Sequence, residues 1–207
     1  MSGHVSSAAD SAPGSSNSRF AARPLEIDGV KLIVPAVISD DRGSFVEVWR
    51  ASEFRRWGVP DLVQDNQALS LRRGTLRGLH FQRPPHAQAK LVRVLAGAIF
   101  DVAVDLRPDS PTFAAWAGAT LTAAGGEQMY VPAGFAHGYC TLEPETVVHY
   151  RCSAYYRPES EGGIVFDDPD VGIAWPVPAD EMTIGTRDRA LPRLRQVQAT
   201  MNRGNQA

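Results

Sequence analysis

Apolar and polar residues alternate with a period of two through the middle of the chain. In AIFDVAVDLR, residues 98–107, four apolar side chains fall on one face while Asp101 and Asp105 fall on the other. The four are Phe100, Val102, Val104 and Leu106. In TVVHYRCSA, residues 146–154, the shared face carries Thr146, Val148, Tyr150 and Cys152. Because side chains of a β-strand point alternately to opposite sides, both stretches predict strands.

Other short strands are expected at 30–37, 44–49, 119–123 and 127–132, separated by turns such as SDDRG and AAGG. Helical patterns are few. Ser52 is placed to cap a helical turn over 53–57 that Gly58 ends, and a weaker pattern covers 191–197. Residues 160–178 are expected to form a long loop. Short strands punctuated by glycine and proline favour an all-β fold, a barrel or a sandwich with short peripheral helices.

The pattern also divides the chain into a core and two tails. Residues 1–22 hold mostly small and polar side chains, which bury too little surface to offset ordering entropy, so a disordered tail is expected there. Residues 23–197 are expected to form one domain, and residues 198–207 a flexible tail.

Composition narrows the class of protein. A net charge of −2 and a pI near 6.2 argue against a nucleic-acid-binding or membrane-surface protein. No apolar run approaches the roughly 20 residues that cross a bilayer, and the first residues lack the features of a secretory signal. Cys140 and Cys152 lie in apolar strand-like segments and are predicted to be reduced, buried thiols. A cytoplasmic protein is expected.

Two segments resemble the paired motifs of the cupin superfamily, a jelly-roll β-barrel. The first runs from Gly74 through His80, and the second is GEQMYVPAGFAH, which ends at His137. In metal-binding cupins the first motif supplies a second histidine and a glutamate, but here Gln82 takes the histidine position and no glutamate follows. Since a metal needs three or four well-placed ligands, no functional metal and no cofactor are expected, and loop residue His86 is expected to be exposed.

The groups left for chemistry are His80, Lys90, His137 and Tyr150. Inward-facing positions of a barrel converge on one cavity, so His80 and Tyr150 are expected to approach a ligand from different walls. Such a pair can remove a proton from one face of a carbon and return one to the other.

The chain also resembles the dTDP-4-dehydrorhamnose 3,5-epimerase family over residues 25–195. The stretches that carry the resemblance are DDRGSFVE, VQDNQALS, LRGLHFQ, QAKLVRVLAGAIFDVAVDLR, SPTF, VPAGFAHGY, VHYRCSAYYRPESEGGI, DDPDVGIAWP and TRDRALP. The resemblance implies inversion of C3 and C5 of a dTDP-4-keto-6-deoxyhexose through an enolate, feeding dTDP-L-rhamnose synthesis. It implies His80 as the base with Asp188 as its carboxylate partner, Tyr150 as the acid, and Lys90 as the cation beside the enolate oxygen.

The resemblance further implies a set of substrate-binding residues and a homodimer, in which the strand near Arg42 crosses into the partner subunit. The binding set is Arg42, Phe45, Glu47, Gln64, Asn66, Arg77, His137, Glu161 and Arg187. Guanidinium groups suit a pyrophosphate and aromatic rings suit a thymine.

Several alternatives stay open on the sequence. Tyr155 and Tyr156 lie close enough to compete for the role of Tyr150. The chain departs from the family pattern at Phe166-Asp167, where Trp-Asn is common, and at Arg187, where the family has lysine, so substrate choice can differ. A mono-epimerase of C3 or C5 alone, a non-catalytic sugar-nucleotide-binding cupin and a metal-dependent cupin oxygenase are the competing functions.

Overall fold

The computed structural model describes residues 18–204. Most of the predicted N-terminal tail and the last three residues therefore lie outside the described part. The strands are β1 (Phe20–Pro24), β2 (Lys31–Pro35), β3 (Val37–Asp40), β4 (Gly43–Val46), β5 (Gln64–Ser70), β6 (Thr75–Gln82), β7 (Lys90–Ala96), β8 (Ala98–Asp105), β9 (Trp116–Thr122), β10 (Gln128–Val131), β11 (Phe135–Thr141), β12 (Thr146–Cys152), β13 (Glu161–Gly163) and β14 (Thr183–Ile184). The helices are α1 (Ala51–Arg56), the 3₁₀ turn η1 (Pro158–Ser160), α2 (Thr186–Arg189) and α3 (Leu194–Gly204).

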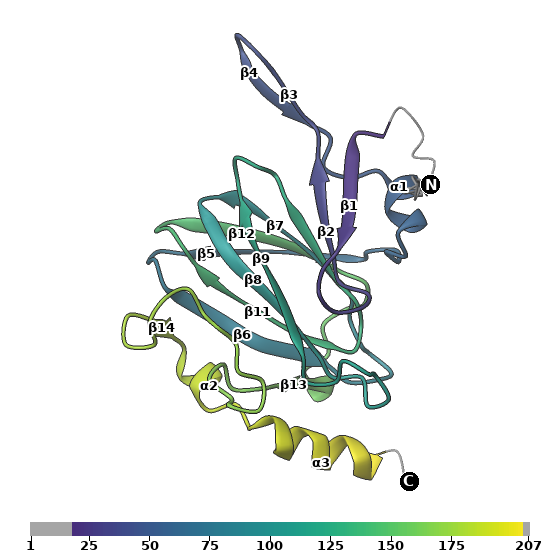
Figure 1. Ribbon diagram of the computed structural model, residues 1–207, viewed down its shortest axis with the longest axis vertical. Coiled ribbons are helices and arrows are strands. Elements are labelled where there is room, and N and C mark those ends of the chain that lie inside the picture. The colour runs from purple at the N-terminus through teal and green to yellow at the C-terminus, as the bar shows by residue number, and fades with distance from the viewer. Residues whose placement is uncertain (1–17, 205–207) are drawn as a thin grey trace, which may run out of the picture.

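Within residues 18–204 the strands form two facing sheets and a separate hairpin (Figure 1). The first sheet has the order β1-β2-β10-β7-β12-β5, and the second has the order β13-β6-β11-β8-β9, with β14 added parallel to β6. Strands far apart in the sequence are neighbours, as in a jelly roll. The predicted all-β, cupin-type fold is confirmed.

The space between the sheets is filled by apolar side chains from both. They include Val92, Val94 and Val148 from the first sheet and Ile99, Ala103 and Phe135 from the second. Polar residues of the same two sheets, among them His80 of β6, Lys90 of β7 and Tyr150 of β12, lie together beside this apolar packing.

Strand β8 shows how the polar face is used. Its alternation is as predicted, but the apolar side chains Val102, Val104 and Leu106 face outward, where they pack against α3 and the 164–175 segment. The opposite face carries Asp101 toward the interior, fully buried. Here the outer face is apolar because a C-terminal segment covers it.

Several boundaries differ from those predicted. Strand β1 begins at Phe20, inside the predicted tail, because it pairs along its length with β2. Helix α3 continues past residue 197 into the segment expected to be flexible. Ser52 lies inside the first turn of α1 rather than capping it, since the helix begins at Ala51. Gly58 follows the helix with a positive φ of 81°, as its role in ending the turn requires.

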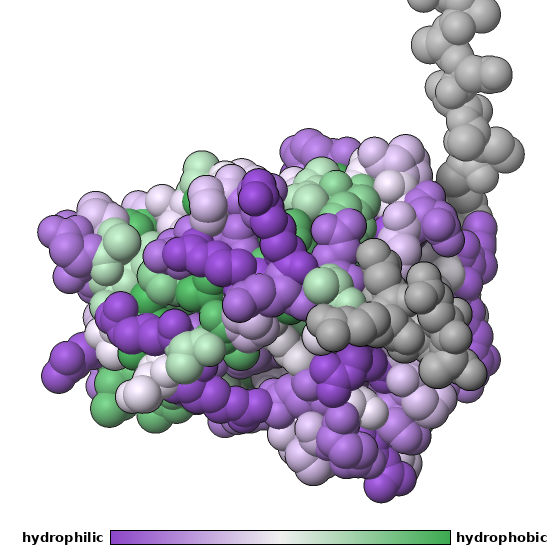
Figure 2. All heavy atoms as spheres, turned by 90° about the horizontal axis from the view of Figure 1, so that it is seen from below, coloured by the Kyte–Doolittle hydropathy of each residue, from purple (hydrophilic) through white to green (hydrophobic). Residues whose placement is uncertain are grey.

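The hairpin of β3 and β4 projects from the body as an arm, which is residues 37–46 (Figure 1). Its strands hydrogen-bond only to each other within the described chain. At the opposite end of the molecule, the face that contains α3 is mostly hydrophilic (Figure 2). No helix of residues 18–204 is long and apolar enough to cross a membrane. Cys140 and Cys152 are free and buried, as predicted.

Candidate active site

Two adjoining cavities open at the polar end of the interior, and they share His80, Lys90 and Tyr150 as lining residues. The larger lobe has a volume of about 520 Å³ and the smaller lobe about 260 Å³. The larger lobe also contains Arg77, His137, Tyr139, Arg187 and Asp188. The smaller lobe also contains Gln64, Asn66, Tyr156 and Glu161. All of the predicted catalytic residues therefore meet at one place.

His80 and Asp188 form a hydrogen-bonded pair although 108 positions separate them. Strand β14 pairs with the start of β6 and thereby sets α2, which carries Asp188, against His80. His80 Nε2 lies 2.9 Å from Asp188 Oδ1, and the backbone N–H of Gly78 donates to Asp188 Oδ2 at 3.2 Å. Burial raises the pKa of Asp188, but the hydrogen bonds and the nearby charges outweigh burial and lower it. An ionised Asp188 holds the proton on Nε2 and leaves His80 Nδ1 as the free basic nitrogen.

A bulge in β6 brings Arg77 and His80 to the same side. Opposite β11, His80 pairs with His137 and Arg77 pairs with Tyr139, so two residues of β6 between these pairs match one residue of β11. Gly78 lies in the bulge with a φ of +128°, and a Cβ there would lie 2.5 Å from the Cα of Gly138. Only glycine fits this close approach of two strands.

Lys90 begins β7 and reaches the junction of the two lobes. Burial lowers its pKa, and the charges of Cys152, Asp101 and Glu161 oppose that effect only in part. Its ammonium makes no hydrogen bond or ion pair with any residue of 18–204. A buried cation without a partner is available to stabilise negative charge that develops on a ligand.

Tyr150 comes from β12 of the sheet that faces His80. It packs against the central core and lines both lobes, and burial raises its pKa. The phenol therefore stays protonated near neutral pH and can donate a proton. Tyr155, by contrast, is 64% exposed and lines neither lobe, so the cavity favours Tyr150 over Tyr155.

His137 also has a carboxylate partner. Its Nε2 lies 2.7 Å from Oδ1 of Asp101, and both side chains are buried. Desolvation is the largest cause of a lowered pKa of His137 and, together with the nearby Lys90 and His80, it outweighs the opposing effect of Asp101, so the imidazole is favoured in its neutral form. The sequence did not predict a site role for Asp101, although an aspartate within an otherwise apolar strand is the feature that could have indicated one.

The smaller lobe gathers amide, phenol and charged groups. Gln64 Nε2 donates to Asn66 at 3.1 Å, and Gln64 Oε1 accepts from the backbone N–H of Tyr156 at 2.9 Å. The Tyr156 hydroxyl donates to Glu161 at 2.7 Å, and Glu161 forms an ion pair with Arg187. Tyr156 was weighed only as a competitor of Tyr150, and its place in this lobe was not predicted.

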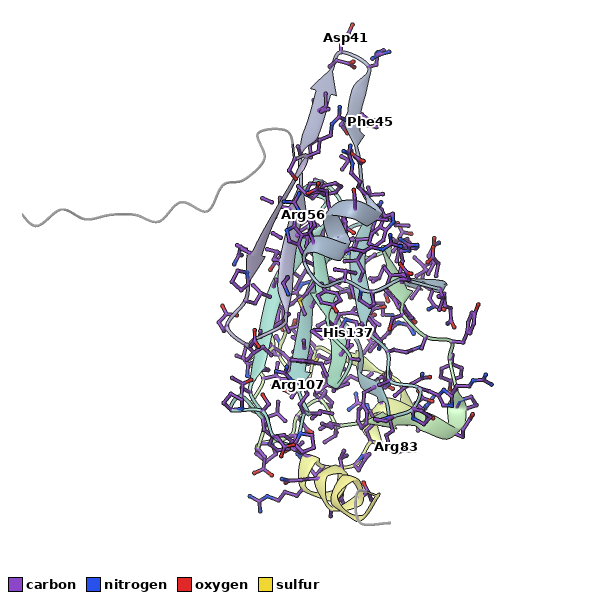
Figure 3. The ribbon with its side chains drawn as sticks, turned by 90° about the vertical axis from the view of Figure 1, so that its right-hand side faces the viewer. Asp41, Phe45, Arg56, Arg83, Arg107 and His137 are labelled. Atoms are coloured by element: carbon purple, nitrogen blue, oxygen red, sulfur yellow. The ribbon has the colours of Figure 1, made fainter. Side chains whose placement is uncertain are left out.

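Three predicted binding residues lie elsewhere. Arg42 and Phe45 are on the arm and Glu47 follows it, and none of them lines either lobe. Figure 3 shows Phe45 near the arm's end, far from His137 in the body. Arg42 pairs with Asp40 at 2.6 Å and Glu47 with Arg50 at 2.7 Å. Within one copy of residues 18–204, these side chains do not reach the cavity.

The remaining sequence departures have different positions. Phe166 is buried in the apolar cluster that the 165–184 segment forms with Leu76 and Cys140, and it lines neither lobe. Arg187, by contrast, lines the larger lobe. Gln82, at the cupin metal-ligand position, donates to the carbonyls of His86 and Tyr155 and accepts from the backbone of Arg157. Its side chain joins two loops and is unsuited to hold a metal.

A jelly roll whose cavity holds a histidine–carboxylate pair opposite a phenol has the architecture of a cupin-fold isomerase. A model of the dTDP-4-dehydrorhamnose 3,5-epimerase family matches residues 24–196. The chain belongs to this family, whose members are isomerases.

Relatives and solved structures agree with this assignment. The dTDP-4-dehydrorhamnose 3,5-epimerase of Sinorhizobium fredii is 53% identical over 154 residues, which cover 73% of this chain and 78% of that protein. A Legionella pneumophila dTDP-6-deoxy-D-glucose-3,5-epimerase in complex with dTDP-4-keto-L-rhamnose is 39% identical, with a TM-score of 0.83 over 88% of this chain and 96% of that one. ChmJ, a 3'-monoepimerase from Streptomyces bikiniensis in complex with dTDP-quinovose, is 35% identical, with a TM-score of 0.79 over 86% and 90%.

Proposed function

We propose that this protein inverts C3 and C5 of dTDP-4-keto-6-deoxy-D-glucose to give dTDP-4-keto-L-rhamnose, without a cofactor. The observation that carries the proposal is the pair of His80, on one sheet, and Asp188, on α2, which faces Tyr150 on the other sheet. The C4 ketone acidifies the hydrogens on C3 and C5, so an accurately placed base and acid are the main chemical requirements.

In the proposed reaction, His80 Nδ1 removes the proton from C3 or C5. Asp188 stabilises the imidazolium that forms, because its carboxylate accepts from Nε2. The electron pair moves onto the C4 oxygen, and the Lys90 ammonium stabilises the resulting enolate. Tyr150 then gives a proton to the opposite face of the same carbon, which inverts it.

The nucleotide is proposed to occupy the smaller lobe. The side chains of Gln64 and Asn66 offer the amide donors and acceptors that a thymine ring needs. Tyr156 adds a half-exposed aromatic ring at the same lobe, suited to stack on a base. Arg77 and Arg187 line the larger lobe and are proposed to bind the pyrophosphate between the nucleotide and the sugar.

The arm supports a homodimer as the working form. Its apolar side chains are open to solvent, with Phe45 60% and Ile38 48% exposed, and a lone two-stranded hairpin is only marginally stable in water. The edge strand β5 leads into a second exposed apolar group, in which Leu71 is 67% exposed. We propose that each arm packs on a second copy and brings Arg42, Phe45 and Glu47 to the partner's cavity.

The two free, buried thiols also support a reducing, cytoplasmic location.

The test is incubation with dTDP-4-keto-6-deoxy-D-glucose in heavy water, followed by NMR of the sugar. Deuterium at both C3 and C5 is the expected result. Uptake at one carbon would assign a mono-epimerase instead. No uptake, with dTDP binding intact, would assign a non-catalytic sugar-nucleotide-binding cupin and overturn the proposal.

A matched pair of variants makes the test specific to the site. His80→Asn removes the proposed base and is expected to slow deuterium uptake by at least about 100-fold. His149→Asn is the control, because His149 lies on β12 near Asp65, outside both lobes. Equal losses in the two variants would argue against His80 as the base.

A further inference from the structure

Two buried polar atoms of the described chain lack a hydrogen-bond partner, and they belong to two cross-strand neighbours. Within residues 18–204 they are the hydroxyl of Tyr139, which lines the larger lobe, and Oδ2 of Asp101, which lies behind it. Because leaving a buried polar atom unpaired is unfavourable, an unpaired hydroxyl on a residue that lines a ligand cavity indicates a contact made by the ligand.

The two residues face each other across neighbouring strands. Tyr139 on β11 pairs with Asp101 on β8, and both side chains point to the inner side, where His137 bonds the other oxygen of Asp101. The Tyr139 ring packs in the central core while the residue lines the larger lobe. Ser70 lies near the phenol but accepts from Arg77 Nε at 3.4 Å and makes no hydrogen bond of good geometry with Tyr139.

Tyr139 is a poor proton source. Burial raises its pKa to about 12, which keeps the hydroxyl neutral at any pH at which the protein works. A neutral phenol in a fixed position both donates and accepts hydrogen bonds. A sugar hydroxyl does the same, so it can supply the partner that the Tyr139 phenol lacks.

We propose that Tyr139 forms a subsite that recognises the 2-hydroxyl of the hexose. This inference rests on the proposed function. The 3-hydroxyl changes direction when C3 is inverted, whereas the 2-hydroxyl sits on a carbon that is not inverted and can keep a fixed contact throughout. C2 also adjoins the carbon that carries the pyrophosphate, and Arg77, proposed to bind that group, is the cross-strand neighbour of Tyr139.

The experiment compares dTDP-4-keto-6-deoxy-D-glucose with its 2-deoxy analogue, using deuterium uptake to measure kcat and KM. The wild-type enzyme is expected to have a kcat/KM at least about 10-fold lower for the analogue, since a site built for a hydroxyl rejects a ligand that lacks it. Tyr139→Phe is expected to lower kcat/KM about 10-fold for the natural sugar but to change it little for the analogue. Inhibition by dTDP should be unchanged in this variant, because dTDP has no hexose and therefore lacks the 2-hydroxyl that Tyr139 is proposed to contact.

Tyr130→Phe is the matched control, because it removes a buried phenol that donates to the carbonyl of Gly58, away from the cavity. Its thermal unfolding midpoint and that of Tyr139→Phe report any purely structural loss.

Equal handling of the two sugars by the wild-type enzyme, or an equal loss on both in Tyr139→Phe, would overturn the subsite while leaving the epimerase intact. No uptake from either sugar by the wild-type enzyme would overturn both proposals.

Discussion

Lys90 is a cation at the junction of the two lobes of the cavity, and its burial there lowers its pKa and so affects the pH dependence of the site. Burial is the largest cause of its lowered pKa, so the ammonium loses its proton at a lower pH than an exposed lysine does. The enolate needs the charged form. The same burial that disfavours the charged form of Lys90 in the free enzyme places that charge where it stabilises the enolate.

The first prediction concerns the alkaline limb of the rate. Because the pKa of Lys90 is lowered from 10.5, kcat/KM is expected to fall as pH rises, beginning below 10.5. Lys90→Gln is expected to remove this limb and to reduce kcat by about 100-fold or more at neutral pH. Deuterium uptake measured between pH 6 and 10.5 checks both effects (roughly the range over which lysine and histidine titrate).

Lys31→Gln serves as the control, since Lys31 lies over the ring of Tyr130 outside the cavity. An alkaline limb unchanged in Lys90→Gln would assign it to another group.

At the scale of the element, the bulge in β6 decides which residues reach the cavity. Without the bulge, strict alternation would place Arg77 and His80 on opposite faces, since they are three positions apart. The bulge depends on Gly78 passing Gly138 at a distance that no side chain allows. The histidines of the two histidine–carboxylate pairs, His80 and His137, lie within two residues of Gly78 and Gly138 in the sequence.

The second prediction is that Gly78→Ala lowers activity strongly. Its Cβ would press on Gly138 and on the carbonyl of His137, which it would meet at 2.9 Å, so β6 must move. A displacement near 1 Å can cost about 100-fold in rate, and a loss of that order is expected.

Gly58→Ala is the matched control, because Gly58 also has a positive φ but nothing lies within 4 Å of its missing Cβ. Similar rate losses in both variants would mean that backbone strain, rather than the strand crossing, is responsible.

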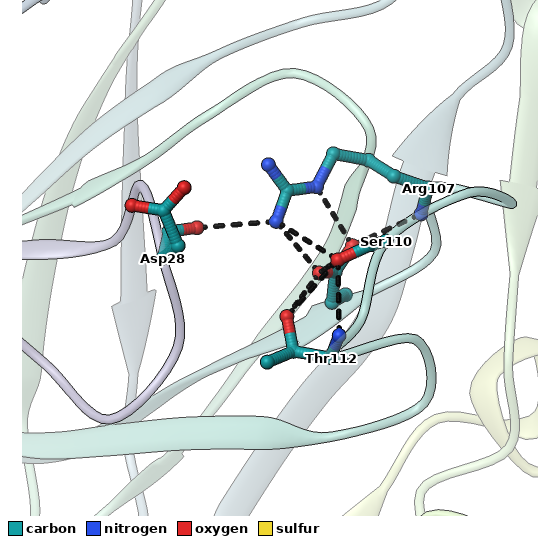
Figure 4. A network of polar contacts seen from close by, with 5 residues as sticks. Asp28, Arg107, Ser110 and Thr112 are labelled. Carbon is teal, nitrogen blue, oxygen red and sulfur yellow. Dashed lines mark hydrogen bonds and ion pairs between the residues drawn. The ribbon is translucent and has the colours of Figure 1, made fainter.

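A second element, the turn after β8, is organised around one buried carboxylate. Asp105 accepts from Arg107 Nε at 2.9 Å, from Ser110 at 2.5 Å and from Thr112 at 2.7 Å (Figure 4). Arg107 also donates to the carbonyl of Asp28, which ties the turn to the segment before β2. Burial alone would raise the pKa of Asp105, but these hydrogen bonds outweigh it and lower the pKa to about 2.

The third prediction follows from that pKa. Because the folded value of about 2 lies below the ordinary 3.8, the stabilisation is fully present above pH 3.8 and is lost as pH falls through 2. Asp105→Asn is expected to lower the free energy of unfolding by about 2 kcal/mol at pH 7 and by less at pH 3. Urea unfolding at the two pH values measures this difference. Asp109→Asn, an exposed change in the same turn, should have little effect; an equal loss there would contradict the assignment.

The same elements show how far the sequence predicts the structure. Period-two alternation located β8 and β12, and the resemblance to the epimerase family indicated His80, Lys90, Tyr150 and Asp188 as one site. Alternation did not reveal which face of β8 is interior, because the cover supplied by α3 is a tertiary contact. The contacts of Asp101 and Tyr139 and the β6 bulge depend on strand register, which local propensity does not determine.

At the scale of the whole molecule, exposed apolar groups concentrate at the arm and near the edge strand β5, away from the polar face around α3. This distribution favours association through the arm end. The proposed dimer would cover Ile38 and Phe45 and would complete a cavity that lacks three of its expected binding residues.

The fourth prediction tests that association. Ile38→Asp adds a charge to the exposed apolar face of the arm and is expected to shift dimers toward monomers and to raise KM more than about 10-fold. Sedimentation velocity measures the association state. Asp41→Asn, at the arm's tip, should stay dimeric. A monomeric wild-type protein with full activity would contradict the dimer.

If the arm of each subunit contributes residues to its partner's cavity, a variant with a defective arm and a variant with a defective cavity can complement each other in a mixed dimer. A subunit with Arg42→Ala keeps its own cavity, and a subunit with His80→Asn keeps its own arm. If the two inactive proteins exchange subunits freely, half of the dimers are mixed, and each mixed dimer holds one intact site. About a quarter of the sites would then work. In a cell with one allele of each kind, the two alleles would complement, although neither supports turnover alone.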